Sequence, residues 1–280
     1  MPHIEPVVGR YYRIPLCGDE ARIYLEEAGR GVPLVCLHTA GADSRQYRHL
    51  LNDPQVTDRF RVSAFDLPRH GRSLPPDRWW ETEYLLTTDV YRDTVMAVAD
   101  ALELESPIVL GCSMGGSLVL ELARAHADRL RGVIGVSGAG KLAGRFPDWP
   151  LHPDVNAQQS VPSWVYGLMA PHGPERDRRD VWWIYAQGGP GIYRGDTYFY
   201  SEDFDLRGRE KEIDTARCPV VLMTGEYDYA CAPEESARTA EAIPGAEFVR
   251  MRGIGHFPMA ENYPLFRTSL LPVLSSLSER

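Results

Sequence analysis

The chain has 280 residues, 44% of them hydrophobic and 25% charged, which is the balance of an ordinary globular protein. Its 30 basic and 39 acidic residues give a formal net charge of -9, which argues against nucleic acid as a partner because nucleic-acid binding needs a basic face. No stretch approaches the roughly 20 apolar residues of a membrane span, and residues 1–15 contain no apolar core of a signal peptide. We therefore expect a cytoplasmic protein that has neither nucleic acid nor a membrane as partner.

The cysteines give no sign of a metal site. They form no C-x-x-C pair, and the histidines do not cluster, so the spacing of a zinc site is missing. An odd number of cysteines without paired spacing fits a protein of a reducing compartment. We expect neither a metal nor an organic cofactor. The cysteines are Cys17, Cys36, Cys112, Cys218 and Cys231.

The first part of the chain predicts strands that alternate with helices. Residues 11–14 and 22–25 alternate in polarity on either side of Gly18-Asp19, which predicts an antiparallel hairpin. The continuous apolar run at 33–37 predicts a strand that is buried on both faces, and residues 60–65 predict another strand. Asp43 or Ser44 can cap the helix after the first run, with Tyr47, Leu50 and Leu51 on its inner face. A second helix is expected from about Tyr84 to Leu104, with one face made of Val90, Thr94, Ala97, Val98 and Ala101.

The same alternation continues to the end of the chain, apart from one segment. Strands are expected at 107–110, 132–137, 218–224 and 246–251, and helices after Ser113, at 233–243 and at 264–277. Because strand and helix alternate, we expect an α/β fold with a mostly parallel, eight-stranded sheet and helices on both of its faces.

Residues 138–213 depart from this pattern. Prolines break the regular periods of this segment, and it holds four of the six tryptophans of the chain. We interpret 138–213 as an inserted cap over the carboxyl edge of the sheet, with 1–137 and 214–280 forming the core domain. Most of its aromatic residues are expected to pack within the cap, and a minority to line an apolar pocket. The candidates for contact with a substrate are Thr39, Trp164, Trp183, Tyr185 and Phe257.

The sequence G-x-S-x-G at 111–115 is the strongest chemical signal in the chain. It follows an apolar strand and precedes an apolar helix, which is the context of a nucleophile elbow. Gly111 and Gly115 allow the tight turn, and the central Ser113 is then presented at the edge of the sheet. The neighbouring Cys112 is expected to pack on the other side of the strand.

A serine nucleophile needs a base, and the base needs a group that orients it. His256 and Asp228 each follow a predicted strand, so both are expected at the sheet edge that carries Ser113. His38 also follows a strand, but a structural hydrogen-bonding role is favoured there. Rivals of Asp228 for the acid are Glu226, Asp203 and Asp205.

Together these motifs resemble the α/β-hydrolase fold superfamily, and in particular its serine hydrolases with a cap domain. The resemblance covers the chain outside the cap, and it implies Ser113 as nucleophile, His256 as base and Asp228 as orienting acid. It also implies an oxyanion hole made by the backbone N–H groups of Met114 and Ala40. Two residues depart from the family pattern, because Thr39 and Arg69 stand where the family commonly has glycine. The motifs are His38-Thr39-Ala40-Gly41, Asp66 to Ser73, Gly111 to Gly116, Gly225 to Asp228 and Gly255-His256.

A serine at the elbow favours attack on a carbonyl carbon, whereas the dehalogenases and epoxide hydrolases that this scaffold resembles carry aspartate there. We expect a hydrolase that cleaves a carboxylic ester of a small or medium substrate with an apolar or aromatic portion. Hydrolysis of a carbon–carbon bond, an amide, a carbamate or a lactone would use the same residues, and a ligand receptor is a third alternative. Arginines that could hold a substrate carboxylate are Arg176, Arg178, Arg179, Arg194 and Arg207.

Overall fold

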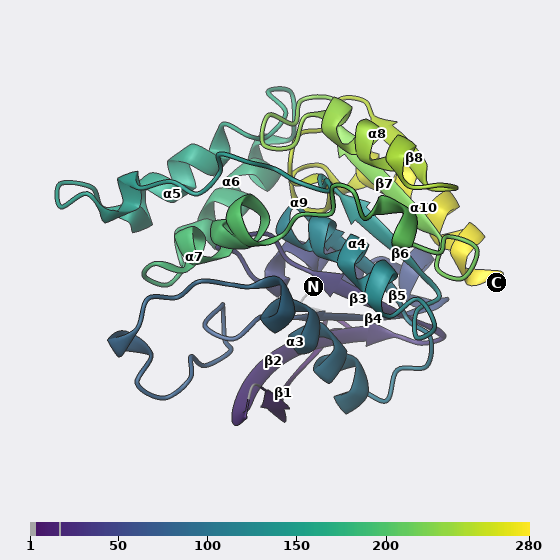
Figure 1. Ribbon diagram of the computed structural model, residues 1–280, viewed down its shortest axis with the longest axis horizontal. Coiled ribbons are helices and arrows are strands. Elements are labelled where there is room, and N and C mark those ends of the chain that lie inside the picture. Colours follow the sequence, from purple (N-terminus) through teal and green to yellow (C-terminus); the bar gives the residue numbers. More distant parts are fainter. Residues whose placement is uncertain (1–3, 17) are drawn as a thin grey trace.

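The computed structural model describes residues 4–16 and 18–280, so His3 and Cys17 lie outside the described residues. A single twisted sheet runs through the centre of the molecule (Figure 1). In the described chain it has eight strands in the order β1-β2-β4-β3-β5-β6-β7-β8. The strands are β1 Val8–Leu16, β2 Asp19–Gly29, β3 Val32–Leu37, β4 Phe60–Phe65, β5 Ile108–Cys112, β6 Gly132–Val136, β7 Val220–Gly225 and β8 Glu247–Met251.

The sheet is mostly parallel, as the alternating pattern predicts. Strand β1 pairs with β2, and β2 pairs with β4, in antiparallel fashion. Every neighbouring pair from β4 through β3 to β8 is parallel. The predicted fold class is therefore confirmed. Since β3, β5, β6, β7 and β8 all run in one direction, the loops that follow them emerge at one edge of the sheet.

Helices cover both faces of this sheet. One face packs against α3, α4 and α8, and the other packs against α1, α2, α9 and α10. Among the described helices, none is long and apolar enough to cross a bilayer. The helices are α1 Arg48–Leu51, α2 Pro54–Thr57, α3 Thr88–Ala101, α4 Met114–Ala125, α5 Ala157–Tyr166, α6 Glu175–Tyr185, α7 Ile192–Tyr198, α8 Pro233–Ala242, α9 Pro258–Glu261 and α10 Tyr263–Ser278.

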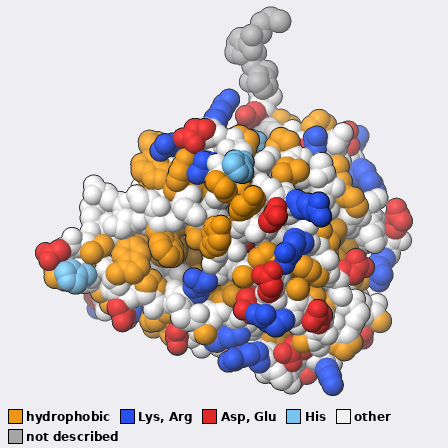
Figure 2. Space-filling model, turned by 90° about the horizontal axis from the view of Figure 1, so that it is seen from above, with side chains coloured by type: hydrophobic (Ala, Val, Ile, Leu, Met, Phe, Trp, Pro, Cys, Tyr) orange, Lys and Arg blue, Asp and Glu red, His pale blue; other side chains and the backbone are white. Residues whose placement is uncertain are grey.

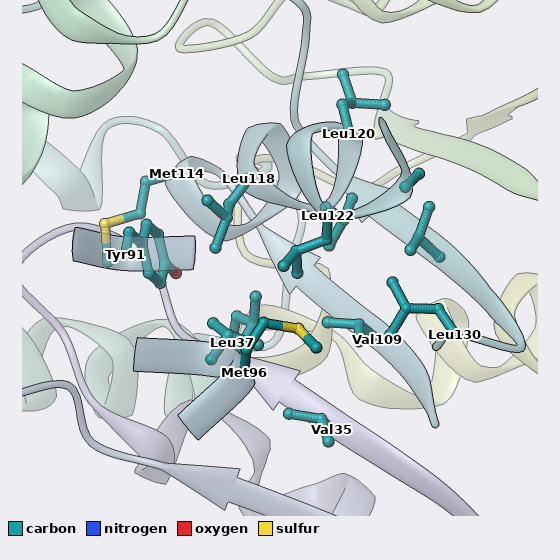
Figure 3. Packing of buried hydrophobic residues seen from close by; sticks show 14 of the residues in the cluster. Val35, Leu37, Tyr91, Met96, Val109, Met114, Leu118, Leu120, Leu122 and Leu130 are labelled. Atoms are coloured by element: carbon teal, nitrogen blue, oxygen red, sulfur yellow. The ribbon is translucent and has the colours of Figure 1, made fainter. Parts of the chain in front are cut away.

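Helix α4 lies in the middle of the core, as its apolar composition predicts. All of its residues from Met114 to Ala123 are buried. Leu118 and Leu122 point to the same side of the helix, with Leu122 near Val109 of the sheet, whereas Leu120 points to the opposite side (Figure 3). The helix that carries the elbow is therefore fixed from two directions.

Helix α3 differs from its prediction. It begins at Thr88 rather than near Tyr84, because the side chain of Thr87 caps it by accepting the N–H of Val90. The predicted inner face is also partly wrong, since Val90 is 36% exposed and Ala101 is exposed. The buried stripe is instead Tyr91, Val95, Val98 and Leu102, which follows the helical period and packs against α4.

The chain between β6 and β7 holds helices α5, α6 and α7. Figure 1 shows them to one side of the sheet, beyond the edge at which the β5 to α4 connection lies. The segment has its own apolar cluster, in which Val161, Val165 and Ile184 pack with Phe257 of the C-terminal part. Figure 2 shows hydrophobic side chains gathered at this end of the molecule, while acidic and basic side chains are mixed over the rest of the face in view.

Candidate active site

Ser113 stands at the junction of β5 and α4 in a strained backbone conformation. Its φ of 58° and ψ of -114° lie outside the regions that serine usually occupies. The backbone N–H of Ser113 donates to the carbonyl of Val136 on the adjacent strand at 2.8 Å, which holds the turn in place. This is the sharp strand-to-helix turn that the G-x-S-x-G pattern predicts.

The glycines of this turn are required by close contacts. A Cβ at Gly111 would lie 2.1 Å from the carbonyl oxygen of Gly115, and one at Gly116 would lie 2.3 Å from that of Val136. At Gly115 the obstacle is Leu37, whose Cβ and carbonyl oxygen would both lie at 2.9 Å. Since most of these atoms belong to the backbone, they cannot move aside.

Asp228 and His256 form a buried pair. The Nδ1 of His256 lies 2.9 Å from Oδ1 and 2.8 Å from Oδ2 of Asp228. The Oδ1 of Asp228 also accepts the backbone N–H groups of Ala230 and Cys231, both at 2.9 Å, so the turn after β7 fixes the carboxylate. With Nδ1 donating to Asp228, the Nε2 atom of His256 is left as the basic nitrogen.

A cavity of about 200 Å³ is lined by both Ser113 and His256. The described hydrogen bonds assign no protein partner to Ser113 Oγ or to His256 Nε2. Apolar and aromatic side chains form most of the remaining wall, which fits a pocket for a small substrate with an apolar part. That wall includes Ala40, Trp149, Trp164, Val165, Leu168, Tyr185, Tyr193, Tyr200 and Phe257.

The backbone N–H groups of Ala40 and Met114 remain available for a ligand. Met114 is the first residue of α4, so its N–H has no partner within the helix. Neither group donates to a described protein atom. Ala40 lines the cavity, and Met114 follows Ser113 directly. Two free donors thus flank Ser113.

Thr39 does not reach the cavity, contrary to the expectation that it contacts a substrate. Its hydroxyl bonds the hydroxyl of Tyr185 at 2.5 Å and accepts from the amide of Gln46 at 2.9 Å. Its φ is not in the left-handed region, which Gly41 occupies instead with φ 73°. The departure from glycine at Thr39 therefore causes no backbone strain, and its hydroxyl serves to hold Tyr185. Arg69, the second departure, does adopt a positive φ, of 76°, where glycine is favoured.

Trp183 also lies away from the cavity. It is 60% exposed and lines a separate surface groove with Glu5 and Arg48. Its neighbour on the next turn back, Arg179, pairs with Glu175 on the surface of α6. Of the candidate substrate contacts, the structure brings Trp164, Tyr185 and Phe257 to the wall of the cavity.

The rival residues have other partners. Glu226 accepts the backbone N–H of Gly253, Asp203 accepts that of Thr88, and Asp205 pairs with Arg207, which lowers the pKa of Asp205 to about 2. His38 accepts the N–H of Leu67 on Nε2 and bonds the carbonyl of Thr39 through Nδ1. The structural role expected for His38 is therefore confirmed.

Glu261 is a buried carboxylate that the sequence analysis missed. It accepts the backbone N–H groups of Gly255, of Ala170 at 3.3 Å and of Phe257 at 3.2 Å. Burial raises the pKa of Glu261, and the three N–H groups oppose that rise. Glu261 thus fixes the chain on both sides of His256 and connects it to the segment between β6 and β7, which we call the insertion.

Asp196 on α7 is a second buried carboxylate that was missed. Its Oδ2 bonds Nε2 of His70 at 2.7 Å and accepts the N–H of Gly41 at 2.7 Å, and its Oδ1 accepts the hydroxyl of Tyr84 at 2.8 Å. Burial lowers the pKa of His70, but the charge and hydrogen bond of Asp196 outweigh it and leave that pKa raised. The insertion is therefore bonded directly to the loop that carries Ala40. Sequence spacing offers no signal for this contact, because Asp196 lies 155 residues from Gly41.

Sequence comparison places the chain among known proteins. A family model described as alpha/beta hydrolase fold matches residues 32–181. The 2-hydroxymuconate semialdehyde hydrolase of Pseudomonas sp. (strain CF600) is 31% identical over 140 residues, which are 50% of this chain and 46% of that protein. The pimeloyl-[acyl-carrier protein] methyl ester esterase of Yersinia enterocolitica is 30% identical over 139 residues, which are 49% of this chain and 48% of that protein. Each match spans a little less than half the length of the relative.

Structure comparison extends the likeness over nearly the whole chain. The enol-lactonase of Burkholderia xenovorans LB400 superposes with a TM-score of 0.80 at 20% identity, covering 95% of this chain and 100% of that one. At this identity the likeness concerns the fold alone. Because the family model matches more than half of the residues, and the elbow and sheet have the geometry described above, the chain belongs to the alpha/beta hydrolase fold family.

Proposed function

We propose that the protein is a serine hydrolase in which Ser113, His256 and Asp228 form a catalytic triad. The observation that supports it best is the cavity shared by Ser113 and His256, with Asp228 bonded to the far nitrogen of the histidine. The preferred substrate is a carboxylic ester with an apolar or aromatic portion, because the cavity wall is mainly aromatic.

The mechanism has two halves. The Oγ of Ser113 attacks the ester carbonyl carbon and its proton passes to Nε2 of His256, while Asp228 stabilises the resulting imidazolium. The N–H groups of Ala40 and Met114 hold the negative oxygen of the tetrahedral intermediate. His256 then gives the proton to the departing alkoxide, which leaves the acyl group on Ser113.

Water completes the cycle. His256 takes a proton from a water molecule as that water attacks the acyl carbonyl, and it returns the proton to Ser113 Oγ when the acid is released. Residues 138–213 act in this proposal as a cap, because α5, α6 and the segment 144–149 supply cavity wall opposite the elbow. The cap sets the size and polarity of the accepted substrate.

The test is hydrolysis of p-nitrophenyl esters of increasing acyl length. We expect Ser113→Ala to lower kcat by about 10⁴-fold or more, with circular dichroism unchanged, and the wild type to show a burst of nitrophenol equal to the enzyme concentration. Ser276→Ala removes an exposed serine of α10 and is the matched control. Undiminished turnover in Ser113→Ala would contradict the proposal.

A second candidate is hydrolysis of a carbon–carbon bond by the same residues. It is supported by the relative whose name is 2-hydroxymuconate semialdehyde hydrolase. A folded wild type that leaves all esters intact but consumes a 2-hydroxymuconate semialdehyde, with loss of this activity in Ser113→Ala, would favour this candidate over the ester hydrolase.

A further inference from the structure

The wall of the cavity beside Ser113 carries one permanent charge. Among the residues that line it, Arg145 is the single arginine, and no aspartate, glutamate or lysine lines it with the described side chains. Arg145 lies in the loop after β6, at the start of the insertion, and is half-buried. The arginines that the sequence suggested for a substrate carboxylate do not line this cavity. Four of them pair with a carboxylate of the protein, namely Arg178, Arg179, Arg194 and Arg207.

Arg145 is held in place without an ion pair. Its backbone N–H donates to the hydroxyl of Ser201 at 2.8 Å, and its Nη2 donates to the carbonyl of Tyr229 at 3.1 Å. The described salt bridges include none to Arg145. A guanidinium has five N–H donors, and one of them is used here, so the others are available to a ligand. Tyr229 follows Asp228, so this contact anchors the guanidinium beside the triad loop.

Two tyrosine hydroxyls lie near this guanidinium. Tyr193 and Tyr200 both line the cavity. The indole N–H of Trp164 donates to the hydroxyl of Tyr193, and the described hydrogen bonds give neither tyrosine hydroxyl an acceptor. Burial raises the pKa of Tyr193 to about 12 and that of Tyr200 well above its usual value, and the positive charge of Arg145 opposes both shifts. The three polar groups therefore share one region of an otherwise apolar cavity.

We propose that Arg145, with the hydroxyls of Tyr193 and Tyr200, forms a subsite for a carboxylate of the substrate. The inference rests on the proposed ester hydrolase and narrows its substrate class to esters that carry a carboxylate on the acyl or the alcohol part. A guanidinium binds a carboxylate through two parallel hydrogen bonds, and phenol hydroxyls add further donors. A positive charge that faces an apolar cavity is unfavourable alone, and a bound carboxylate compensates it.

The experiment compares esters that match in length and differ in charge. Monomethyl glutarate is paired with methyl pentanoate, and carboxymethyl butanoate with ethyl butanoate, so that each side of the ester is tested. Acid release is followed by pH-stat in wild type, Arg145→Gln, Arg145→Lys and Arg207→Gln. Arg207 is an exposed arginine outside the cavity and serves as the control.

We expect Arg145→Gln to lower kcat/KM for at least one anionic ester by about 10- to 100-fold, the range of hydrogen bonds to charged groups. The kcat/KM for the neutral esters should change by less than about threefold. Arg145→Lys should keep part of the preference for anionic esters, because lysine retains the positive charge but lacks the planar guanidinium that makes two parallel hydrogen bonds. If Arg145→Gln lowers kcat/KM equally for charged and neutral esters, Arg145 has a structural role and the subsite is overturned. Unchanged kcat/KM for every ester in Arg145→Gln would overturn it as well, and the ester hydrolase would stand.

A binding measurement separates the two proposals if no ester is cleaved. Titration calorimetry of glutarate and butanoate into folded wild type and Arg145→Gln needs no turnover. If the wild type binds glutarate or butanoate and Arg145→Gln does not, the subsite is supported even if the protein proves not to be an ester hydrolase. Absent binding, or binding that is unaffected by the substitution, would overturn the subsite.

Discussion

Ser113 has a backbone conformation that costs free energy, on the order of 1–3 kcal/mol for such outliers. The cost is offset by its surroundings, since its N–H is bonded to Val136 and its helix is buried on all sides. At the same scale, Asp228 and Glu261 each accept several backbone N–H groups, so both carboxylates are fixed before any substrate binds. The fixed position of Asp228 suits the orienting role that the proposed triad gives it.

Asp228→Asn should leave the fold intact and lower kcat by about 10⁴-fold, the scale of the same change in a serine protease. The asparagine oxygen can still accept the N–H groups of Ala230 and Cys231. Its amide would donate to Nδ1 of His256 and hold the imidazole in the wrong tautomer. Steady-state kinetics with a circular dichroism control checks this. Activity equal to that of the wild type would return Glu226 to consideration as the acid.

Glu261→Gln should lower the free energy of unfolding by about 1–3 kcal/mol, because its amide would face the N–H of Phe257 with no acceptor for it. The pKa of Glu261 is raised in the folded protein, so its stabilising contribution is complete below the unfolded value and is lost as pH rises through the folded one. The difference in the free energy of unfolding between wild type and Glu261→Gln should therefore become smaller from pH 4.5 to pH 8. Urea denaturation across this range measures it, and a difference that grows with pH would contradict the assignment.

At the scale of elements, the junction between β5 and α4 depends on backbone contacts that leave no space for a side chain. Gly111, Gly115 and Gly116 bring α4 against β3, β5 and β6. The pattern of apolar residues around α4 reflects the same arrangement, since a helix pressed against a sheet and covered by other elements is buried on every side. The position of the serine is thus a property of the strand, the turn and the helix together.

Gly116→Ala should destabilise the protein by about 1–3 kcal/mol, the range for overpacked sites, because its Cβ would meet the carbonyl of Val136. Gly140→Ala is the matched control, since the nearest atom to its Cβ would lie 3.4 Å away. Thermal unfolding of both variants tests the argument. Equal stability of the two would show that the elbow tolerates a methyl group at this position.

At the scale of the whole molecule, the insertion and the core are joined by buried polar contacts. Asp196 of α7 binds His70 and Gly41 of the core, and Glu261 of α9 binds Ala170 of the insertion. Removal of one partner from a buried ion pair costs about 3–5 kcal/mol, because the other charge remains without compensation. The insertion is therefore expected to unfold together with the core and not before it.

Asp196→Asn should lower stability by several kcal/mol and change its dependence on pH. The pKa of His70 is raised, so its contribution is complete below an unfolded value of about 6.5 and is lost as pH rises through the folded value. His38, Asp66 and Tyr84 also face this pair. Thermal unfolding from pH 5.5 to pH 8.5 should show the stability of the wild type declining relative to the variant. Asp154→Asn, at an exposed position of the insertion, is the control.

The sequence by itself determined the alternation of strands and helices, the parallel sheet and the elbow. These features follow from periodicity and from glycine spacing, which act over a few residues. It also indicated that Asp228 and His256 meet, because the loops after parallel strands share one edge. The catalytic roles of these residues and the cap boundaries at 138–213 stay predictions.

Only the tertiary structure decided which residues of the insertion face Ser113. It placed Arg145 and Tyr193 at the cavity and Trp183 outside it, and it brought Asp196 and Glu261 to the loops of the site. These contacts join residues of the insertion to distant parts of the chain, and the direction of each side chain depends on how α5, α6 and α7 dock. Docking of that kind follows from packing and charge compensation in three dimensions, and local sequence patterns do not encode it.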